Sequence, residues 1–168
     1  LVEAHGTGTV VGDKTELSAL TDTYLQAGAA PRSVALGSVK SQIGHTKCAA
    51  GMAGLIKVAL SIYRRTLTPT LHMKTPNKAY EASESPFVFY DRPQPWLSDT
   101  RWGAVSAFGF GGTNFHATLR EAPHTPAPTH LRSAWAQEPL VLWAYSAHAL
   151  RERAARWLEA LNARLSLI

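Results

Sequence analysis

The sequence lacks several features that mark common classes of protein. Its 168 residues include one cysteine, which excludes an internal disulfide framework and fits a reducing compartment. The longest strongly apolar stretch, residues 51–60, is too short to span a bilayer and contains Lys57. The first residues are not a basic segment followed by an apolar run, so we expect no signal peptide. We therefore predict a soluble, cytoplasmic chain that does not contact a membrane.

Common ligand-binding motifs are missing as well. There is no paired-cysteine motif and no His-Glu-x-x-His pattern, so we predict no metal site. The glycine-rich segment 5–12 is not followed by the Gly-Lys-Ser/Thr of a phosphate-binding loop, and Asp13 would repel phosphate. The glycines of segment 109–112 lead into an alternating, strand-like pattern, whereas a dinucleotide fingerprint leads into a helix.

Composition and charge indicate a globular protein with a protein partner. Hydrophobic residues make up 45% of the chain and charged residues 17%, which is typical of a folded domain. The formal net charge is +5, and the lysines and arginines are scattered. An acidic protein partner is favoured over nucleic acid, because no aromatic-and-basic platform for single strands is visible. Residues 1–4 have the pattern of a strand already in progress, so we expect the sequence to belong to a longer one.

Periodicity and turn residues predict alternating strands and helices. The predicted elements are a strand over 1–4, a helix over 13–28, a strand over 34–39, a helix ending near 65, a strand over 87–90, a hairpin of 102–108 with 114–120, a strand over 140–145 and a helix over 147–165. Asp13 is the expected N-cap of the first helix, with Glu16 completing a capping box. In the second helix, the predicted apolar face consists of Leu55, Ile56, Ala59, Leu60 and Tyr63, and the small residues of its first half suit close packing against another backbone.

Four side chains are candidates for chemistry. His5 and His45 each lie in a glycine-containing loop between a strand and a helix, where an imidazole meets either a substrate or the loop's own backbone groups. Lys57 stands among apolar residues, and a lysine in such a place commonly extends its ammonium to solvent. Cys48 lies beside a run of small residues, which favours a small buried thiol over a nucleophile.

Several segments together resemble the β-ketoacyl synthases, in particular the ketosynthase domains of polyketide and polyunsaturated fatty-acid synthases. The matching segments are residues 2–9 (Val-Glu-Ala-His-Gly-Thr-Gly-Thr), 12–13, 37–45, 49–57 and 106–114. The resemblance implies an α/β, thiolase-like layered αβαβα fold, of which residues 1–123 are the C-terminal half. Residues 124–168 would be a connector and the beginning of the small α/β linker domain that joins a ketosynthase to an acyltransferase domain.

The resemblance also implies an activity, a transferase that catalyses decarboxylative Claisen condensation of an acyl thioester with a malonyl-type extender on acyl carrier protein. His5 and His45 would be the two active-site histidines, and Lys57 a supporting charge. Thr7 and Thr9 would bind the phosphopantetheine arm of the carrier protein, which is the implied substrate carrier; no covalently bound cofactor is implied. The backbone amide of Phe110 would help to bind the acyl oxygen, with Gly111 and Gly112 permitting a strained turn.

One part of the family's machinery is not found in this sequence. The nucleophilic cysteine of the family lies in an N-terminal segment, and Cys48 does not match its context. Without a nucleophile, covalent catalysis is impossible, so we expect the isolated chain to be inactive. Two hypotheses follow: a piece of an active, homodimeric ketosynthase that works with its N-terminal half, or a non-catalytic scaffold, dimerisation or carrier-protein docking piece.

Overall fold

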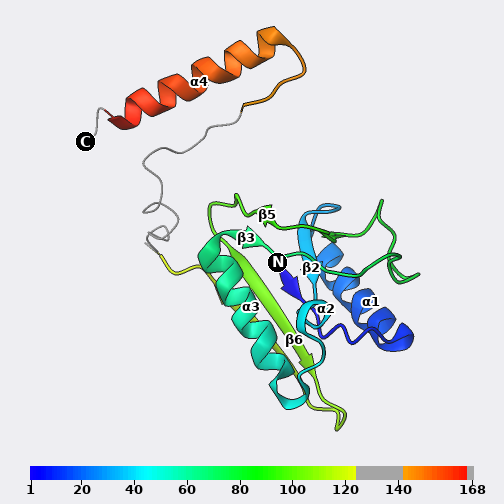
Figure 1. The fold of residues 1–168 in the computed structure, drawn as a ribbon. Helices are drawn as coiled ribbons and strands as arrows, with labels where there is room; N and C mark the ends of the chain where they lie inside the picture. Colours follow the sequence, from blue (N-terminus) through cyan, green and yellow to red (C-terminus); the bar gives the residue numbers. More distant parts are fainter. Residues whose placement is uncertain (124–141, 166–168) are drawn as a thin grey trace. The chain divides into compact units, whose positions relative to one another are not determined.

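The computed structural model describes residues 1–123 and 142–165 (Figure 1). The chain divides into two compact units, Leu1–Pro128 and Thr129–Ile168. The boundary after residue 123 that the resemblance implies stays a prediction. Within the described residues, no helix is both long and apolar enough to cross a membrane.

The first unit is built on a mixed five-stranded sheet. Its strands, in spatial order, are β4 (Phe87–Val88), β2 (Val34–Gly37), β1 (Val2–Glu3), β6 (Trp102–Phe108) and β7 (Asn114–Arg120). The first four are mutually parallel, and β7 pairs antiparallel with β6. The predicted hairpin is confirmed at both strands. A separate antiparallel pair, β3 (Thr66–Leu67) with β5 (Gln94–Pro95), lies in segments predicted as loops.

Two helices cover opposite faces of this sheet (Figure 1). Side chains alternate between the faces along each strand. Val2, Leu36 and Ala104 pack with Leu17 and its neighbours on α1 (Val10–Gln26). Their sequence neighbours Leu1, Ala35 and Val105 pack with Val58 and Ile62 on α3 (Ala50–Arg64). The unit is therefore a helix–sheet–helix sandwich, which is the arrangement expected of half a layered thiolase-like fold.

The start of α1 differs from the prediction. The helix begins at Val10 with Thr9 as its N-cap, so Asp13 is not the cap and no capping box forms. Both acidic side chains instead accept hydrogen bonds from amides of the preceding loop: Asp13 from Gly8, and Glu16 from His5 and Gly6. The predicted stop at Gly28 is confirmed, because this glycine has φ +78° just after the helix.

The apolar face predicted for α3 is mostly exposed, and the side that carries the small residues Ala50 and Gly54 packs against the sheet. Ile56, Ala59, Leu60 and Tyr63 are exposed, and Leu55 is half-buried. The residues that face the sheet are instead Ala50, Gly54, Lys57, Val58, Ser61 and Ile62. The reason is close approach of the helix to the sheet: a Cβ on Gly54 would lie 3.0 Å from Glu3 Cγ and 3.3 Å from Val105 Cγ1. A short helix, α2 (Lys40–Ile43), lies in the segment that we predicted as a loop, residues 40–46, and a 3₁₀ turn, η1 (Lys47–Ala49), replaces the expected start of the helix.

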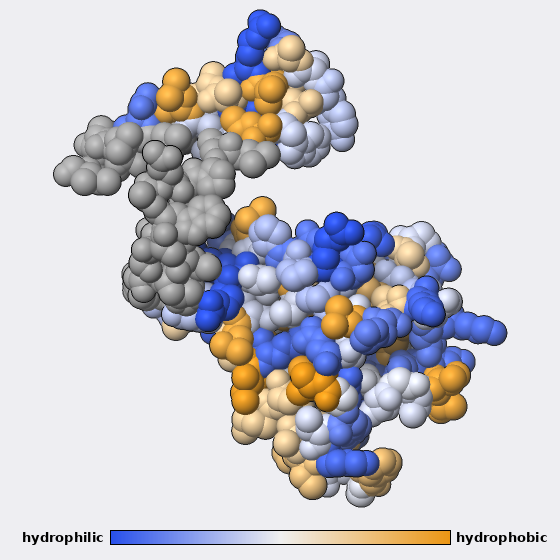
Figure 2. All heavy atoms as spheres, viewed as in Figure 1, coloured by the Kyte–Doolittle hydropathy of each residue, from blue (hydrophilic) through white to orange (hydrophobic). Residues whose placement is uncertain are grey.

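The outer side of α3 carries an apolar stripe. Met52, Ile56, Leu60 and Tyr63 recur at helical spacing and are all exposed. In Figure 2, apolar residues gather on the side of the first unit where α3 lies. Contiguous apolar surface of this kind is associated with partner binding or aggregation.

In the second unit the structure describes α4 (Ala147–Leu165), whose predicted range is confirmed. Arg153 Nη1 donates to the carbonyl of Trp143 at 2.7 Å, and its guanidinium lies 5.4 Å from the centre of the Trp143 ring. The strand predicted over 140–145 is not found at residues 142–145, and residues 140–141 lie outside the described part.

We predict that the isolated chain associates at low micromolar concentration, because the α3 stripe is left uncovered. The double variant Ile56→Glu/Leu60→Glu should shift sedimentation toward the 18.2 kDa monomer, since carboxylates resist burial in an apolar contact. Leu25→Glu, at an exposed leucine of α1, is the matched control and should leave association unchanged. A wild-type chain that sediments as a monomer and unfolds cooperatively would refute the half-fold interpretation.

A second prediction tests the contact between β6 and α3. A Cβ on Gly103 would collide with Val58 Cγ1, so Gly103→Ala should destabilise the fold by about 1–3 kcal/mol. Gly111→Ala adds the same methyl group where no atom lies within 4 Å, and should change stability by less than about 0.5 kcal/mol. Urea denaturation of both variants measures the difference, and equal stabilities would contradict this packing.

Candidate active site

The two histidines and the glycine-rich tip follow the ends of three neighbouring parallel strands, at one edge of the sheet. β1 ends two residues before His5, β2 ends just before the segment that contains Lys40 and His45, and β6 ends at Phe108. The carboxyl ends of parallel strands lie at the same edge, where ligands commonly bind. The glycine-rich tip that holds Phe110 follows directly from β6.

The two histidines predicted as site residues do meet. Their ring centroids are 6.1 Å apart and their planes are almost perpendicular, at 89°. His5 also contacts the ring of Phe108, with 5.3 Å between centroids. The loops that carry the two histidines are far apart in the sequence, so tertiary structure alone creates this pair.

Both histidines present the same ring nitrogen to the backbone. The amide of Phe108 donates to His5 Nδ1 at 3.4 Å, and the amide of Lys47 donates to His45 Nδ1 at 3.0 Å. A neutral imidazole has one acceptor and one donor nitrogen, so a ring that accepts at Nδ1 carries its proton on Nε2. Each neutral histidine therefore has an Nε2–H available as a hydrogen-bond donor.

The electrostatics around His5 favour the neutral ring. Burial lowers the pKa of His5, and the nearby positive charge of Lys40 and the neighbouring His45 lower it further. Asp13 acts in the opposite direction but is the smallest of these influences. The lowered pKa favours the neutral form of the His5 ring.

The loop after β1 is held by Glu16. Its two carboxylate oxygens accept the amides of His5 at 2.8 Å and of Gly6 at 2.9 Å. Burial raises the pKa of Glu16, while these two hydrogen bonds oppose the shift. Gly6 has φ +43°, and a Cβ there would lie 2.9 Å from Ser38 Cβ, so a glycine is required where the two loops cross.

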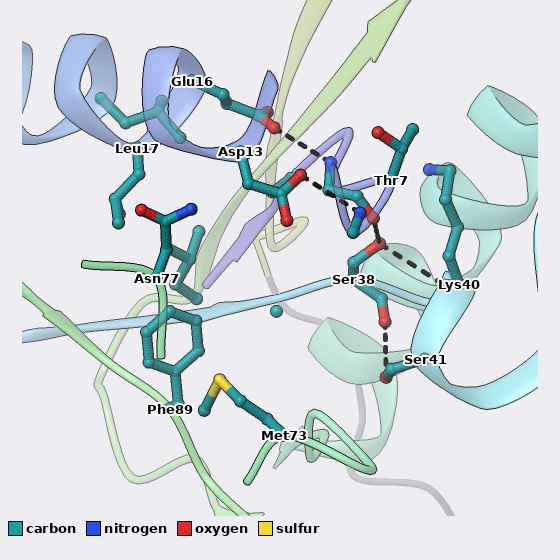
Figure 3. Close-up of a pocket in the computed structure, with 16 residues that line it drawn as sticks. Thr7, Asp13, Glu16, Leu17, Ser38, Lys40, Ser41, Met73, Asn77 and Phe89 are labelled. Atoms are coloured by element: carbon teal, nitrogen blue, oxygen red, sulfur yellow. Dashed lines mark hydrogen bonds between the residues drawn. The ribbon is translucent and has the colours of Figure 1, made fainter. Parts of the chain in front are cut away.

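A cavity of about 290 Å³ lies beside this loop. Figure 3 shows polar side chains at the cavity from α1, from the segments after β1 and β2, and from Asn77 between β3 and β4. The polar lining side chains include Thr7, Asp13, Glu16, Ser38, Lys40, Ser41 and Asn77, and the apolar ones include Leu17, Leu20, Leu36, Met73 and Phe89. The cavity therefore adjoins the loop of His5 and is reached by Lys40.

The threonines and the hairpin tip are accessible to a ligand. Thr7 and Thr9 are exposed, and their hydroxyl oxygens are 3.3 Å apart. Phe110 is fully exposed at the tip. Gly112 has φ +81° and supplies the strained position of the turn, whereas Gly111 does not have a positive φ. The binding roles of Thr7, Thr9, Phe110 and Gly111 stay predictions.

Lys57 does not extend to solvent, so that interpretation is wrong. Its side chain is 7% exposed, and Nζ lies 2.6 Å from Oε2 of Glu3, which is 1% exposed. Its ammonium is thus engaged by a buried carboxylate between α3 and β1. Cys48 was also misjudged, because its thiol is exposed on η1.

Lys40 is the site lysine that we missed. It lines the cavity, burial lowers its pKa, and its charge influences His5. The available signal was its position at the start of a segment that ends in His45, within one of the stretches that carry the family resemblance.

A helix–sheet–helix unit with its candidate residues at one sheet edge is the arrangement expected of the C-terminal half of a thiolase-like fold, and comparison with known proteins gives the family. Residues 1–74 match the profile of the β-ketoacyl synthase C-terminal domain. The chain is 43% identical over 163 residues to erythronolide synthase EryA2 of Saccharopolyspora erythraea, a match covering 96% of this chain and 5% of that protein. It is also 43% identical over 162 residues to polyketide synthase GfsA of Streptomyces halstedii, covering 93% of this chain and 2% of that protein.

Solved structures agree with the sequence matches. The ketosynthase from module 6 of the bacillaene synthase of Bacillus subtilis 168 is 43% identical with a TM-score of 0.70, over 73% of this chain and 23% of that one. Ketosynthase domain OzmH KS7 of Streptomyces albus JA3453 is 38% identical with a TM-score of 0.68, over 96% and 27%. The chain therefore belongs to the β-ketoacyl synthases and corresponds to the C-terminal part of a polyketide synthase ketosynthase, which confirms the predicted family and fold.

We predict that Lys40→Met raises the pKa of His5, because it removes a positive charge that disfavours protonation of the ring. Asp13→Asn should lower the same pKa, because it removes the opposing negative charge. NMR titration of ¹⁵N-labelled histidine rings measures both shifts. Lys14→Met, at an exposed lysine of α1, is the control and should leave the His5 titration in place. Shifts of the opposite sign would contradict this arrangement of charges.

Proposed function

We propose that this chain supplies the condensing half of a ketosynthase active site. His5 and His45 donate hydrogen bonds together to the thioester carbonyl oxygen of a malonyl-type extender carried by acyl carrier protein. The observation that carries the proposal is the histidine pair itself, two rings 6.1 Å apart whose Nδ1 atoms accept backbone amides. This arrangement leaves two Nε2–H donors for one oxygen.

The proposed chemistry requires neutral donors. When the bond between the malonyl carboxylate and its α-carbon breaks, CO₂ leaves and the electron pair forms an enolate with negative charge on the thioester oxygen. The enolate carbon then attacks the acyl thioester, a carbon–carbon bond forms, and the cysteine thiolate departs. Fixed N–H donors in a site with little water stabilise the enolate most where its charge develops. The lowered pKa of His5 favours the uncharged form of that donor.

Lys40 adds positive charge to the same site. Lys40 is partly buried, lines the cavity beside the His5 loop and influences the charge of His5, although neither histidine lines that cavity; the malonyl carboxylate and the enolate that replaces it are both negative. We assign to Lys40 the supporting charge that the resemblance placed at Lys57. A cation held near the malonyl group favours its binding and the development of enolate charge.

The remaining contacts are assigned to the substrate carrier. The exposed hydroxyls of Thr7 and Thr9 are assigned to hydrogen bonds with the phosphopantetheine arm, which the carrier protein brings as part of the substrate. The amide of Phe110, next to Gly111 on the exposed tip, is assigned to the acyl oxygen. The net charge of +5 suits an acidic carrier protein.

Further partners complete the proposed enzyme. The N-terminal half of the ketosynthase supplies the nucleophilic cysteine, and the exposed α3 stripe is the surface assigned to contact with that half. A homodimer of the complete domain and an adjacent acyltransferase domain are the other assemblies implied. The isolated chain is expected to yield no β-ketoacyl product.

In a complete ketosynthase that contains this chain, we predict that His5→Ala and His45→Ala each reduce condensation about 10²–10³-fold, because each removes one enolate donor. Acylation of the nucleophilic cysteine should largely survive, since it precedes enolate formation. Product formation from malonyl carrier protein and mass spectrometry of the acyl-enzyme separate the two steps. His116→Ala, at an exposed histidine of β7, is the control. Condensation near the wild-type rate in either variant would remove that histidine from the mechanism.

A further inference from the structure

The buried ion pair of Glu3 and Lys57 is the feature that the proposed function leaves unused. Glu3 is 1% exposed at the end of β1, and Lys57 is 7% exposed on the sheet-facing side of α3. The two glycines next to the pair leave room for it. A Cβ on Gly54 would lie 3.0 Å from Glu3 Cγ, and one on Gly37 would lie 3.5 Å from Lys57 Nζ. The backbone thus approaches the pair closely from both β2 and α3.

Glu3 uses its two oxygens for different partners. Oε2 accepts the ammonium of Lys57 at 2.6 Å, and Oε1 accepts the backbone amide of Val39 at 2.5 Å. Val39 is the N-cap residue of α2, the short helix that begins with Lys40 and ends at Ile43. Gly44 and His45 follow directly. Glu3 itself stands two residues before His5. One carboxylate therefore connects the segment of His5 to the segment of Lys40 and His45.

Burial explains why the carboxylate needs a lysine. Desolvation raises the pKa of Glu3, and the charge of Lys57 and the amide of Val39 oppose that shift. An unpaired carboxylate in this place would be strongly unfavourable, whereas a paired one persists as an acceptor. The ammonium of Lys57 faces Glu3, so its effect on the site passes through Glu3 and the Val39 amide.

We propose that Glu3 is a positioning residue: its carboxylate holds the Val39 amide and thereby sets the spacing of the two histidines, and Lys57 serves to neutralise it. The proposal rests on the proposed function for its consequence in catalysis. According to this proposal, the spacing of the histidines depends on a hydrogen-bond acceptor at residue 3. It does not depend on a charge at residue 57.

Two double variants separate these requirements. Glu3→Gln/Lys57→Met removes both charges at similar volume and keeps an acceptor oxygen for Val39. Glu3→Leu/Lys57→Met removes the same charges at similar volume and has no acceptor. Buried ion pairs commonly tolerate replacement by uncharged residues of similar size, so the two variants are a matched pair.

The first measurement is made on the 168-residue chain and does not depend on activity. Hydrogen exchange should show the Val39 amide protected in the wild type and in the Gln/Met variant, and exchanging about tenfold faster or more in the Leu/Met variant, since a lost hydrogen bond costs about 1–3 kcal/mol. Proton NMR contacts between the His5 and His45 rings should follow the same order. Equal protection and equal ring contacts in the two variants would overturn the proposal, whatever the enzyme's activity.

The second measurement is made in a complete ketosynthase that contains this chain. Condensation should stay within about threefold of wild type in the Gln/Met variant, and kcat should fall about 10²-fold in the Leu/Met variant, the loss expected from a site misplaced by about 1 Å. KM for the malonyl carrier protein and acylation of the cysteine should change little. Loss of condensation in the Gln/Met variant would overturn the proposal and return a direct role to Lys57. This comparison remains decisive if the Leu/Met variant does not fold.

If the wild-type enzyme were inactive, the proposed function would be contradicted. The hydrogen-exchange measurement would then still test whether Glu3 positions the Val39 segment. Exchange results as expected, together with full condensation in the Leu/Met variant, would show that the acceptor does not set the histidine geometry, and would overturn the inference.

Discussion

Glu3 and Lys57 bring two opposite charges into the interior between β1 and α3, and the loops of the candidate site are arranged around them. A carboxylate or an ammonium buried alone costs several kcal/mol, so each group depends on the other to remain charged there. The pair places a charged acceptor at the end of the central strand, where the amide of Val39 begins the next functional segment. The packing of α3, which brings Lys57 to Glu3, therefore affects the position of the segment that begins at Val39.

Two other acidic side chains of the candidate site also accept hydrogen bonds from backbone amides of loops. A loop that joins a parallel strand to a helix exposes backbone amides that strand pairing does not satisfy. Glu16 accepts two such amides, from His5 and Gly6, and Asp13 accepts that of Gly8. These carboxylates fix the backbone, so the imidazole of His5 remains available. Its Nδ1 accepts the amide of Phe108, which leaves the proton of the neutral ring on Nε2.

The surface of the first unit is consistent with a protein that acts with a larger partner. The chain spans 23% of a solved ketosynthase chain that it resembles. The outer side of α3 is apolar and exposed, and the strand β7 at the sheet edge is almost entirely exposed. Charges that matter for the site lie on the opposite, sheet-facing side of α3. The helix α3 thus presents Lys57 inward, to Glu3 of β1, and an apolar stripe outward.

Local sequence patterns were sufficient for several elements. The hairpin of β6 and β7, the helix α4 and the stop at Gly28 were predicted at the residues where the structure has them, because alternation, helical periodicity and glycine turns act over a few residues. The family motifs gave both histidines as candidate residues, and the structure brings their rings together. These features depend on residues that are neighbours in the chain.

Tertiary structure decided what periodicity left open. α3 has apolar residues on two sides, and the face carrying Gly54 was buried because a backbone without side chains approaches the sheet more closely. The same approach enclosed Lys57 with Glu3, 54 residues away, where the sequence predicted an ammonium in water. Lys40 lies in the candidate site because β1 and β2 are parallel neighbours, so the segments that follow them lie at the same edge of the sheet. The sequence by itself determined the elements and the chemistry of their side chains, and the packing of distant segments determined which charges were buried, because burial depends on contacts that no local pattern records.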